Sequence, residues 1–242
     1  DGKPGVLGAC PNYIFHATAT PDDPRYDEMW GMPFIEAPGA WDIATGSRDI
    51  VVAVVDTGIK RDHADLAANV VRDIDGEWGI DTVNNDRDPA DDQGHGTHVA
   101  GTIGAAGNNA LGVTGVNWTV GLLGVKVLGA DGSGPLDKII EGLEYVLDQR
   151  TRGLNVRVVN MSLGGWMPPS YVFVIPYENA VKALSDAGIL VVVAAGNEYQ
   201  DIDHPGGPGS DPKNPGTDYR GLLCYPACFQ LANSITVASV KA

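Results

Sequence analysis

The strongest constraint on the fold is an alternation of continuous apolar runs with stretches of helical periodicity. Five runs are rich in β-branched residues and show no polar alternation, which is typical of strands buried on both faces of a parallel sheet. They span residues 50–55, 121–128, 156–161, 189–194 and 235–240. Two helices are predicted between them, at residues 135–149, with Pro135 suited to the first turn, and at residues 177–187, capped by Gly188. The sequence therefore predicts an α/β fold with a doubly wound, mostly parallel sheet and helices on both faces.

Charge and apolar content exclude some classes of partner. The net charge of −15 would repel phosphate groups, which argues against nucleic acid. No run approaches the roughly 18 apolar residues that a membrane-spanning helix needs, so no membrane partner is expected. The excess of carboxylates has two interpretations: a solubilising surface, or acidic loops that hold cations. At 242 residues, the chain suits one large α/β domain or a little less.

Polar residues follow three of the predicted strands at the point where each strand ends. Asp56 and Ser162 come directly after apolar runs, and Asn197 follows another run after a short Ala-Gly turn. His95, flanked by glycines, opens a run of small residues that is typical of a loop turning into a helix. Because ligands bind outside the carboxyl ends of the strands in open α/β sheets, these residues are expected at one edge.

These residue types suit nucleophilic hydrolysis. An imidazole with an ordinary pKa of about 6.5 can remove a hydroxyl proton near neutral pH. His95 would need a carboxylate to set its tautomer and stabilise its charged form, and Asp56 is the best candidate. The side-chain N–H of Asn197 could bind an oxyanion. The sequence thus offers an acid, a base and an oxyanion donor.

Each residue alone has a simpler interpretation. The Asp-Thr-Gly motif at Asp56 also occurs in aspartic proteases, but those need two such carboxylates and the sequence has one motif. His95 and His98 could suggest a metal pair, although no further His or Cys lies near them, and a helix-borne His98 packed on the sheet is the better explanation. Asn197 alone would more often be a cap or turn residue. The combination of the three, in this order, is harder to explain without catalysis.

From about residue 21 onward the chain resembles the subtilisin-like serine protease family, the subtilases, and most of all their secreted bacterial type. The resemblance implies that Asp56 is the orienting acid, His95 the general base and Asn197 the oxyanion donor. Many matches in the same order make it specific. Besides the motifs at Asp56 and His95, they are Trp30-Gly31, Ala40-Trp41-Asp42, Lys126-Val127-Leu128, Asn160-Met161-Ser162-Leu163-Gly164-Gly165 and Ala194-Ala195-Gly196-Asn197.

The resemblance also implies a polypeptide substrate, bound as an added β-strand between two edges of the chain. One edge is Gly132-Ser133-Gly134 and the other is Ser162-Leu163-Gly164. The first side-chain pocket would be built partly from Ser162–Gly165 and partly from Ala194–Asn197. Its small residues would admit a large apolar side chain.

One departure from the family concerns the nucleophile. The family places a serine in a Gly-Thr-Ser motif, but the Gly-Thr pairs at residues 96–97, 101–102 and 216–217 are not followed by serine. We therefore expect the serine beyond residue 242, on a missing segment or a separate C-terminal fragment. Residues 21–242 would be a peptidase domain that lacks its C-terminal third, inactive alone and with apolar surface exposed on its sheet. Residues 1–20 resemble the tail of an inhibitory propeptide, or are an N-terminal extension.

Calcium is the cofactor that the resemblance implies. A first oxygen cage would combine Asp65 with Asn109 and the carbonyls of Leu111 and Val113. A second is suggested by an acidic loop just before His95, whose carboxylates would repel one another without a cation. A solvated acidic loop is the alternative. The oxygen-bearing residues of that loop are Asp81, Asn84, Asp86, Asp88 and Asp91.

These expectations combine into one predicted function. The protein would be a secreted, calcium-stabilised serine endopeptidase, made as a zymogen that its own propeptide inhibits, and acting through an acyl-enzyme. The alternative is a non-catalytic protein that binds extended peptides without cutting them. In an exported protein, Cys224 and Cys228 could close a small disulfide loop, and remaining reduced is the other interpretation.

Overall fold

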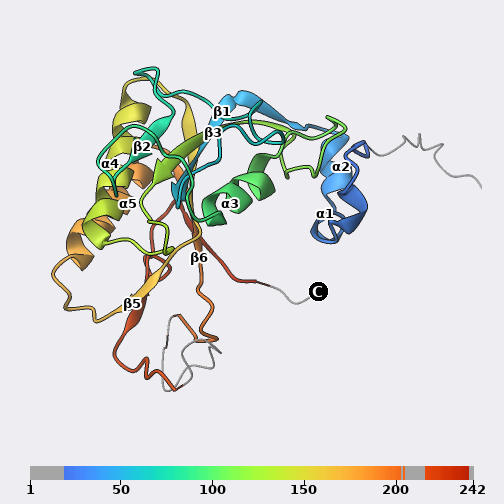
Figure 1. Cartoon of the computed structure of the whole chain (residues 1–242). Helices are drawn as coiled ribbons and strands as arrows, with labels where there is room; N and C mark the ends of the chain where they lie inside the picture. Colours follow the sequence, from blue (N-terminus) through green and yellow to red (C-terminus); the bar gives the residue numbers. More distant parts are fainter. Residues whose placement is uncertain (1–18, 203, 205–215, 240–242) are drawn as a thin grey trace, which may run out of the picture.

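A six-stranded parallel sheet organises the molecule. The structure is a computed structural model that describes residues 19–202, 204 and 216–239. The strand order is β2-β3-β1-β4-β6-β8 (Figure 1). The chain turns back beside β1, with β3 on one side and β4 on the other, so the sheet is doubly wound as predicted. The strands are β1 Gly46–Asp56, β2 Gly79–Asp81, β3 Thr119–Lys126, β4 Val156–Met161, β6 Leu190–Ala194 and β8 Ser234–Val237.

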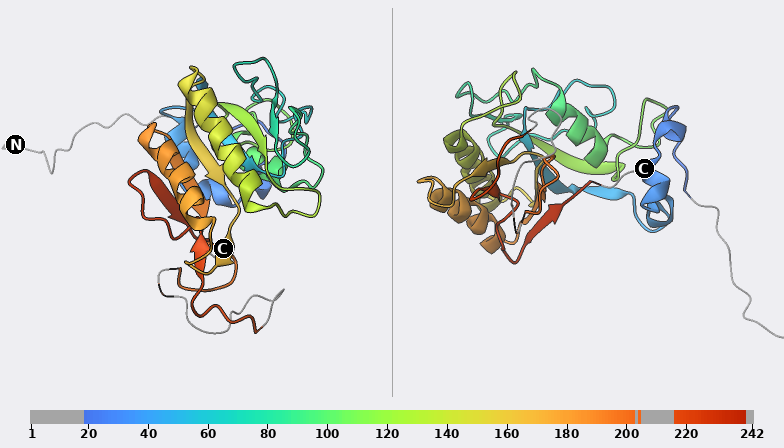
Figure 2. Two further views of the ribbon diagram at one scale, coloured as in Figure 1. Left: turned by 90° about the vertical axis from the view of Figure 1, so that its left-hand side faces the viewer. Right: turned by 90° about the horizontal axis from the view of Figure 1, so that it is seen from below.

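Helices cover both faces of the sheet. α4 (Leu136–Thr151) and α5 (Val174–Asp186) lie side by side on one face, and α3 (His95–Gly104) lies on the other (Figure 2). The core follows the pleat of β1, because Val51, Ala53 and Val55 pack in the cluster with α4 and α5. The intervening Val52 and Val54 pack in the cluster with α3. Burial on both faces explains why these strands are continuous apolar runs.

The two predicted helices are confirmed with small shifts at their ends. Pro135 is the N-cap of α4 rather than its first residue, and α5 begins at Val174, three residues earlier than predicted. Gly188 follows the C-cap of α5 with φ of +73°, a left-handed conformation that glycine adopts without steric cost. In the described part of the chain, no helix is long and apolar enough to cross a membrane.

Several short helices and strands were not predicted from the sequence. β5 (Gly165–Met167) and β7 (Leu223–Tyr225) form a separate two-stranded antiparallel sheet (Figure 1). Three residues are too few to show a period of two, which is also why β2 was not predicted. The N-terminal helices η1 (Tyr26–Glu28), α1 (Gly31–Phe34) and α2 (Ala37–Trp41) form their own apolar cluster around Trp41.

Some sequence predictions concern the ends of the described region. The interpretation of residues 1–20 as a propeptide tail falls on residues 1–18, which lie outside the described residues, and Cys10 lies there too. β8 stops at Val237, earlier than the predicted residue 240. Its side chains Ile235 and Val237 are 49% and 50% exposed, so this edge of the sheet does present apolar surface.

Candidate active site

An acid and a histidine meet where β1 ends and α3 begins. Asp56, the last residue of β1, is fully buried, and its Oδ1 lies 2.7 Å from Nδ1 of His95, the first residue of α3. The backbone N–H of Thr57 donates to the same oxygen at 2.7 Å. Because Asp56 accepts at Nδ1, the neutral imidazole keeps its proton there and leaves Nε2 as a base. Asp56 Oδ2 is buried and has no hydrogen-bond partner among the described residues.

The loop before His95 is held by one carboxylate. Asp91 Oδ1 accepts from Thr57 Oγ1 and from the N–H groups of Gln93 and Gly94, at 2.8–3.0 Å. Its Oδ2 accepts from the N–H and the hydroxyl of Thr97 at 2.9 and 2.5 Å. Burial raises the pKa of Asp91, but the hydrogen bonds from these groups outweigh burial and lower it to about 2. Asp91 therefore stays ionised and fixes the loop that presents the histidine.

Close packing behind the histidine requires glycine at position 96. A Cβ on Gly96 would collide with the carbonyl oxygen of Gly58, in the turn that follows Asp56. The N–H of Gly96 donates to Thr57 Oγ1 at 2.9 Å, which joins α3 to the same turn. The start of α3 thus lies directly against the end of β1, and this contact brings the acid and the base together.

A buried lysine connects three segments of the site. Lys126, the last residue of β3, is 1% exposed. Its ammonium donates to the carbonyls of Thr57 and Leu128 at 2.8 and 2.9 Å, and to Asp92 Oδ1 at 2.6 Å. All three donors of the ammonium are satisfied, as burial of such a group demands. In the sequence Lys126 stands out only as part of a family motif, and this role was not predicted from it.

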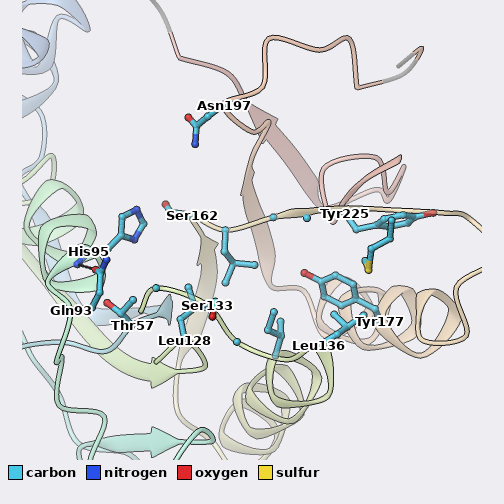
Figure 3. Close-up of a pocket in the computed structure, with 17 residues that line it drawn as sticks. Thr57, Gln93, His95, Leu128, Ser133, Leu136, Ser162, Tyr177, Asn197 and Tyr225 are labelled. Atoms are coloured by element: carbon cyan, nitrogen blue, oxygen red, sulfur yellow. Dashed lines mark hydrogen bonds between the residues drawn. The ribbon is translucent and has the colours of Figure 1, made fainter. Parts of the chain in front are cut away.

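Both predicted substrate edges line one cleft of about 540 Å³. His95, Ser162 and Asn197 lie at one end, and Tyr177 and Tyr225 lie at the other (Figure 3). The predicted residues on the cleft wall are His95, Asn197, Gly132, Ser133, Gly134, Ser162, Leu163 and Gly164. Ala194, on β6, and Gly196, beside Asn197, are not part of this wall, so their role in a side-chain pocket stays a prediction.

Several wall residues were missed by the sequence analysis. They are Thr57, Gln93, Leu128, Leu136, Ile139, Met167, Tyr177 and Tyr225, whereas Gly165, predicted as part of the first side-chain pocket, does line the cleft. Most are apolar side chains on helices or short strands, and their pattern in the sequence indicates only burial. The signal available for Leu128 was its place in the motif Lys126-Val127-Leu128. For Tyr177 and Tyr225 no local signal existed.

No serine completes the acid–base pair in the described part of the chain. Ser162 Oγ accepts from Asn160 Nδ2 at 2.9 Å, and Ser133 Oγ donates to Asp131 at 2.7 Å. No serine hydroxyl among the described residues is hydrogen-bonded to the His95 ring. The expectation of a nucleophile beyond residue 242 stays a prediction.

The first predicted calcium group is brought together. Asp65, 4% exposed, accepts from Asn109 Nδ2 at 3.1 Å and from the N–H of Val113 at 2.8 Å. Asn109 Oδ1 in turn accepts from the N–H of Leu111 at 2.8 Å. These residues fit a cation only in part, because their side-chain oxygens are directed at N–H donors. A bound cation would require the Asn109 amide to turn its oxygen toward Asp65.

The second predicted calcium group is occupied by other contacts. Asp81 is 2% exposed and accepts from two N–H groups of the following turn and from Asn84 Nδ2. Asp86 accepts from the N–H of Asp88, and the Asp88 carboxylate pairs with Arg61. Within the described residues, no three His, Cys, Asp or Glu side chains are grouped to hold a metal. A calcium site in this loop stays a prediction, and it has little support because its carboxylates already bind N–H groups and Arg61.

Other titratable side chains differ in their surroundings. His98 is exposed on α3 and lines a second cavity of about 520 Å³, so the prediction that it packs on the sheet is wrong. Cys224 and Cys228 are not joined to each other by a disulfide in the structure. Burial, then the nearby Glu198 and Cys228, raise the pKa of Cys224 to about 12, which keeps this thiol protonated and unreactive.

Comparison with known proteins places this geometry in context. Residues 47–242 match the subtilase family. Thermitase from Thermoactinomyces vulgaris is 40% identical over 179 residues, which cover 74% of this chain and 58% of thermitase. An extracellular protease from Xanthomonas campestris pv. campestris is 36% identical, over 87% of this chain and 40% of the relative. The chain spans about half the length of the curated relatives it matches.

A solved structure is similar as well. It belongs to the proteases from Pseudoalteromonas arctica and superposes with a TM-score of 0.61 at 33% sequence identity. The match covers 76% of this chain and 61% of that structure.

Proposed function

This chain belongs to the subtilase family, and on that premise we propose that it carries the acid–base and substrate-binding part of a serine endopeptidase. The observation that carries the proposal is the 2.7 Å contact between Asp56 and His95. Support comes from the cleft, which His95 shares with Asn197 and with two peptide-binding edges.

In the proposed reaction His95 acts as the general base. A serine, expected beyond residue 242, attacks the peptide carbonyl as Nε2 of His95 takes the hydroxyl proton. The same proton passes to the leaving amine, the C–N bond breaks, and an ester between serine and substrate remains. Water then hydrolyses this ester, with His95 again as the base. Asp56 holds the tautomer through Nδ1 and stabilises the imidazolium.

Asn197 is proposed to bind the oxyanion. It lies with His95 at one end of the cleft (Figure 3), and its side-chain amide can donate to a carbonyl oxygen that becomes negative. Its own backbone N–H is already used, since it donates to Glu198 Oε2 at 2.8 Å. The side chain is therefore the donor that this residue has available.

The substrate class that fits the cleft is an extended polypeptide. Gly132 and Gly134 on one edge and Gly164 on the other line the cleft, and an extended peptide backbone would pair with both edges. The wall also includes the apolar residues Leu128, Leu136 and Ile139, together with Leu163 of the second edge. Apolar side chains from unfolded or flexible protein segments would fit there. We extend the proposal to secretion, since one relative is an extracellular protease, and to release from an inhibitory propeptide.

Calcium remains a proposal for the Asp65 loop. The fit there rests on one buried carboxylate and an amide that can be turned, as described above. Calcium would tie this loop to the segment that follows α3, which contains Asn109, and would stabilise the fold. Chelation by EDTA is expected to lower the thermal unfolding temperature of the protein, and Asp65→Asn should remove that sensitivity. An unfolding temperature unaffected by EDTA would end the calcium proposal.

The experiment that tests the proposed function is fluorophosphonate labelling of the full-length protein, with the labelled peptide identified by mass spectrometry. Labelling is expected on a serine that follows residue 242. His95→Ala should abolish labelling, and the matched control His98→Ala, three residues along the same helix, should retain it. Folded protein that takes no label, or a label that survives His95→Ala, would contradict the proposal.

A further inference from the structure

The proposed oxyanion donor lies in a turn that the sheet holds at its start. β6 ends at Ala194, and the N–H of Ala195 donates to the Val237 carbonyl of β8 at 2.9 Å. Asn197, two residues farther along, is exposed, so packing does little to fix its side chain. In Figure 3 its amide nitrogen is nevertheless directed toward the end of the cleft where His95 lies. The direction of this amide therefore depends on contacts within the turn.

Glu198 supplies such a contact. Its Oε2 accepts from the backbone N–H of Asn197 at 2.8 Å. Hydrogen bonds to a carboxylate are roughly twice as strong as those between neutral groups. This N–H belongs to the planar peptide unit between Gly196 and Asn197, so holding it fixes the plane from which the Asn197 side chain projects. Glu198 is half-buried although the two residues before it are exposed, which means that its side chain folds back onto the turn.

Glycine at position 196 makes room for this carboxylate. Gly196 has a φ of +93°, a left-handed conformation, and a Cβ there would lie 2.4 Å from Glu198 Oε2. The Cys224 thiol is a second neighbour of the turn, with its Sγ 4.0 Å from the Ala195 carbonyl oxygen. Burial and then the charge of Glu198 raise the pKa of Cys224 to about 12. The carboxylate thus lies on the side of the turn that faces β7.

We propose that Glu198 is a positioning residue for the reaction, because its carboxylate holds the Asn197 peptide so that the side-chain amide meets the oxyanion. The inference rests on the proposed function, since it assumes that Asn197 binds the oxyanion. A negative charge near a developing oxyanion is by itself unfavourable, so the benefit comes from the contact and not from the charge. Oxyanion donors work because they are fixed before the reaction, and loss of one lowers kcat by about 10²–10³. Misplacing the amide should cost part of this factor.

The first test measures peptide hydrolysis by the full-length protein. Glu198→Ala should lower kcat by about tenfold and leave KM within about twofold, because the oxyanion forms only in the transition state. Glu198→Gln keeps an oxygen that can accept from the same N–H, and it should retain most of kcat. A loss in Glu198→Gln as large as in Glu198→Ala would mean that the charge matters, and would overturn the inference. A change confined to KM would overturn it too, since a glutamate that merely touches the substrate gives that result.

A double-mutant cycle with Asn197→Ala separates action through Asn197 from a direct effect. Glu198→Ala should lower kcat about tenfold in the wild type but less than about twofold once Asn197 is alanine. A tenfold loss in both backgrounds would show that Glu198 acts independently of Asn197, and would overturn the inference. The matched control is Glu178→Ala, which removes an exposed carboxylate of α5 and should leave kcat unchanged. An equal loss in this control would attribute the effect to net charge and would overturn the inference as well.

If the wild type cuts no peptide, the proposed function fails, and the contact is then measured directly. Hydrogen exchange followed by NMR should show that the Asn197 backbone N–H exchanges about tenfold faster in Glu198→Ala than in the wild type. Glu198→Gln should exchange at nearly the wild-type rate. Equal rates in the three proteins would mean that Glu198 does not hold this peptide, and would overturn the inference whether or not peptides are cut.

Discussion

Replacing Lys126 by methionine should destabilise the protein by removing three hydrogen bonds at once. The ammonium is almost fully buried and donates to the carbonyls of Thr57 and Leu128 and to Asp92. Methionine matches the length of the apolar stem, so the substitution leaves no large cavity. The effect therefore comes from the polar groups that lose their donor.

The magnitude follows from the burial of each partner. Thr57 and Leu128 are 0% and 8% exposed, so their carbonyls would be left buried and unpaired, each costing about 1–3 kcal/mol. The Asp92 side chain is 48% exposed and would be rehydrated, which adds little. Loss of the buried charge returns part of the desolvation cost. The expected net decrease in the free energy of unfolding is about 3 kcal/mol.

Urea unfolding followed by tryptophan fluorescence measures this change. The matched control is Lys60→Met, because Lys60 is a surface residue whose side chain is 60% exposed and whose nearest carboxylate, Asp62, lies 3.8 Å away. Its substitution should change the free energy of unfolding by less than about 0.5 kcal/mol. If Lys126→Met were as mild as Lys60→Met, the reasoning that this ammonium holds the site together would be refuted.

Three further predictions address the acid, the loop and the packing of the site. In the full-length protein, Asp56→Asn should lower kcat for peptide hydrolysis by about 10⁴ with little change in KM; a loss below tenfold would exclude it as the orienting acid. Because the pKa of Asp91 is lowered to about 2, its contribution to stability is present above pH 4 and is lost as the pH falls toward 2. After allowance for solvent screening, this contribution to the free energy of unfolding is about 1 kcal/mol. Acid unfolding followed by circular dichroism should show that Asp91→Asn loses less stability than the wild type as the pH falls from 4 toward 2. Identical acid unfolding curves for the two proteins would contradict this prediction. Gly96→Ala should destabilise by about 2 kcal/mol or more in urea because its Cβ collides with Gly58, whereas Gly101→Ala, with no atom near its Cβ, should be neutral or stabilising.

The sequence by itself determined the type of sheet and the edge that carries the site. Strands buried on both faces must be apolar throughout, so β4 (Val156–Met161) could be predicted to the residue. The carboxyl ends of parallel strands share one edge, which is why Asp56 and Asn197 could be expected near each other before any coordinates. The parallel order of β1, β4 and β6 confirms the shared edge, because this inference depends only on local periodicity and on one general rule of topology.

Only the tertiary structure decided which polar groups have hydrogen-bond partners and which have none. In the sequence Asp91 belongs to an acidic loop that suits a cation, yet five N–H and O–H donors from the folded loop already bind it. Lys126 looks like the end of a strand, and its burial becomes acceptable only because three segments bring acceptors to it. Tyr177 has the pattern of a core residue on a helix, and only the fold shows that its buried hydroxyl has no hydrogen-bond partner among the described residues. Hydrogen-bond partners distant in the chain meet only after folding, and no local pattern encodes them.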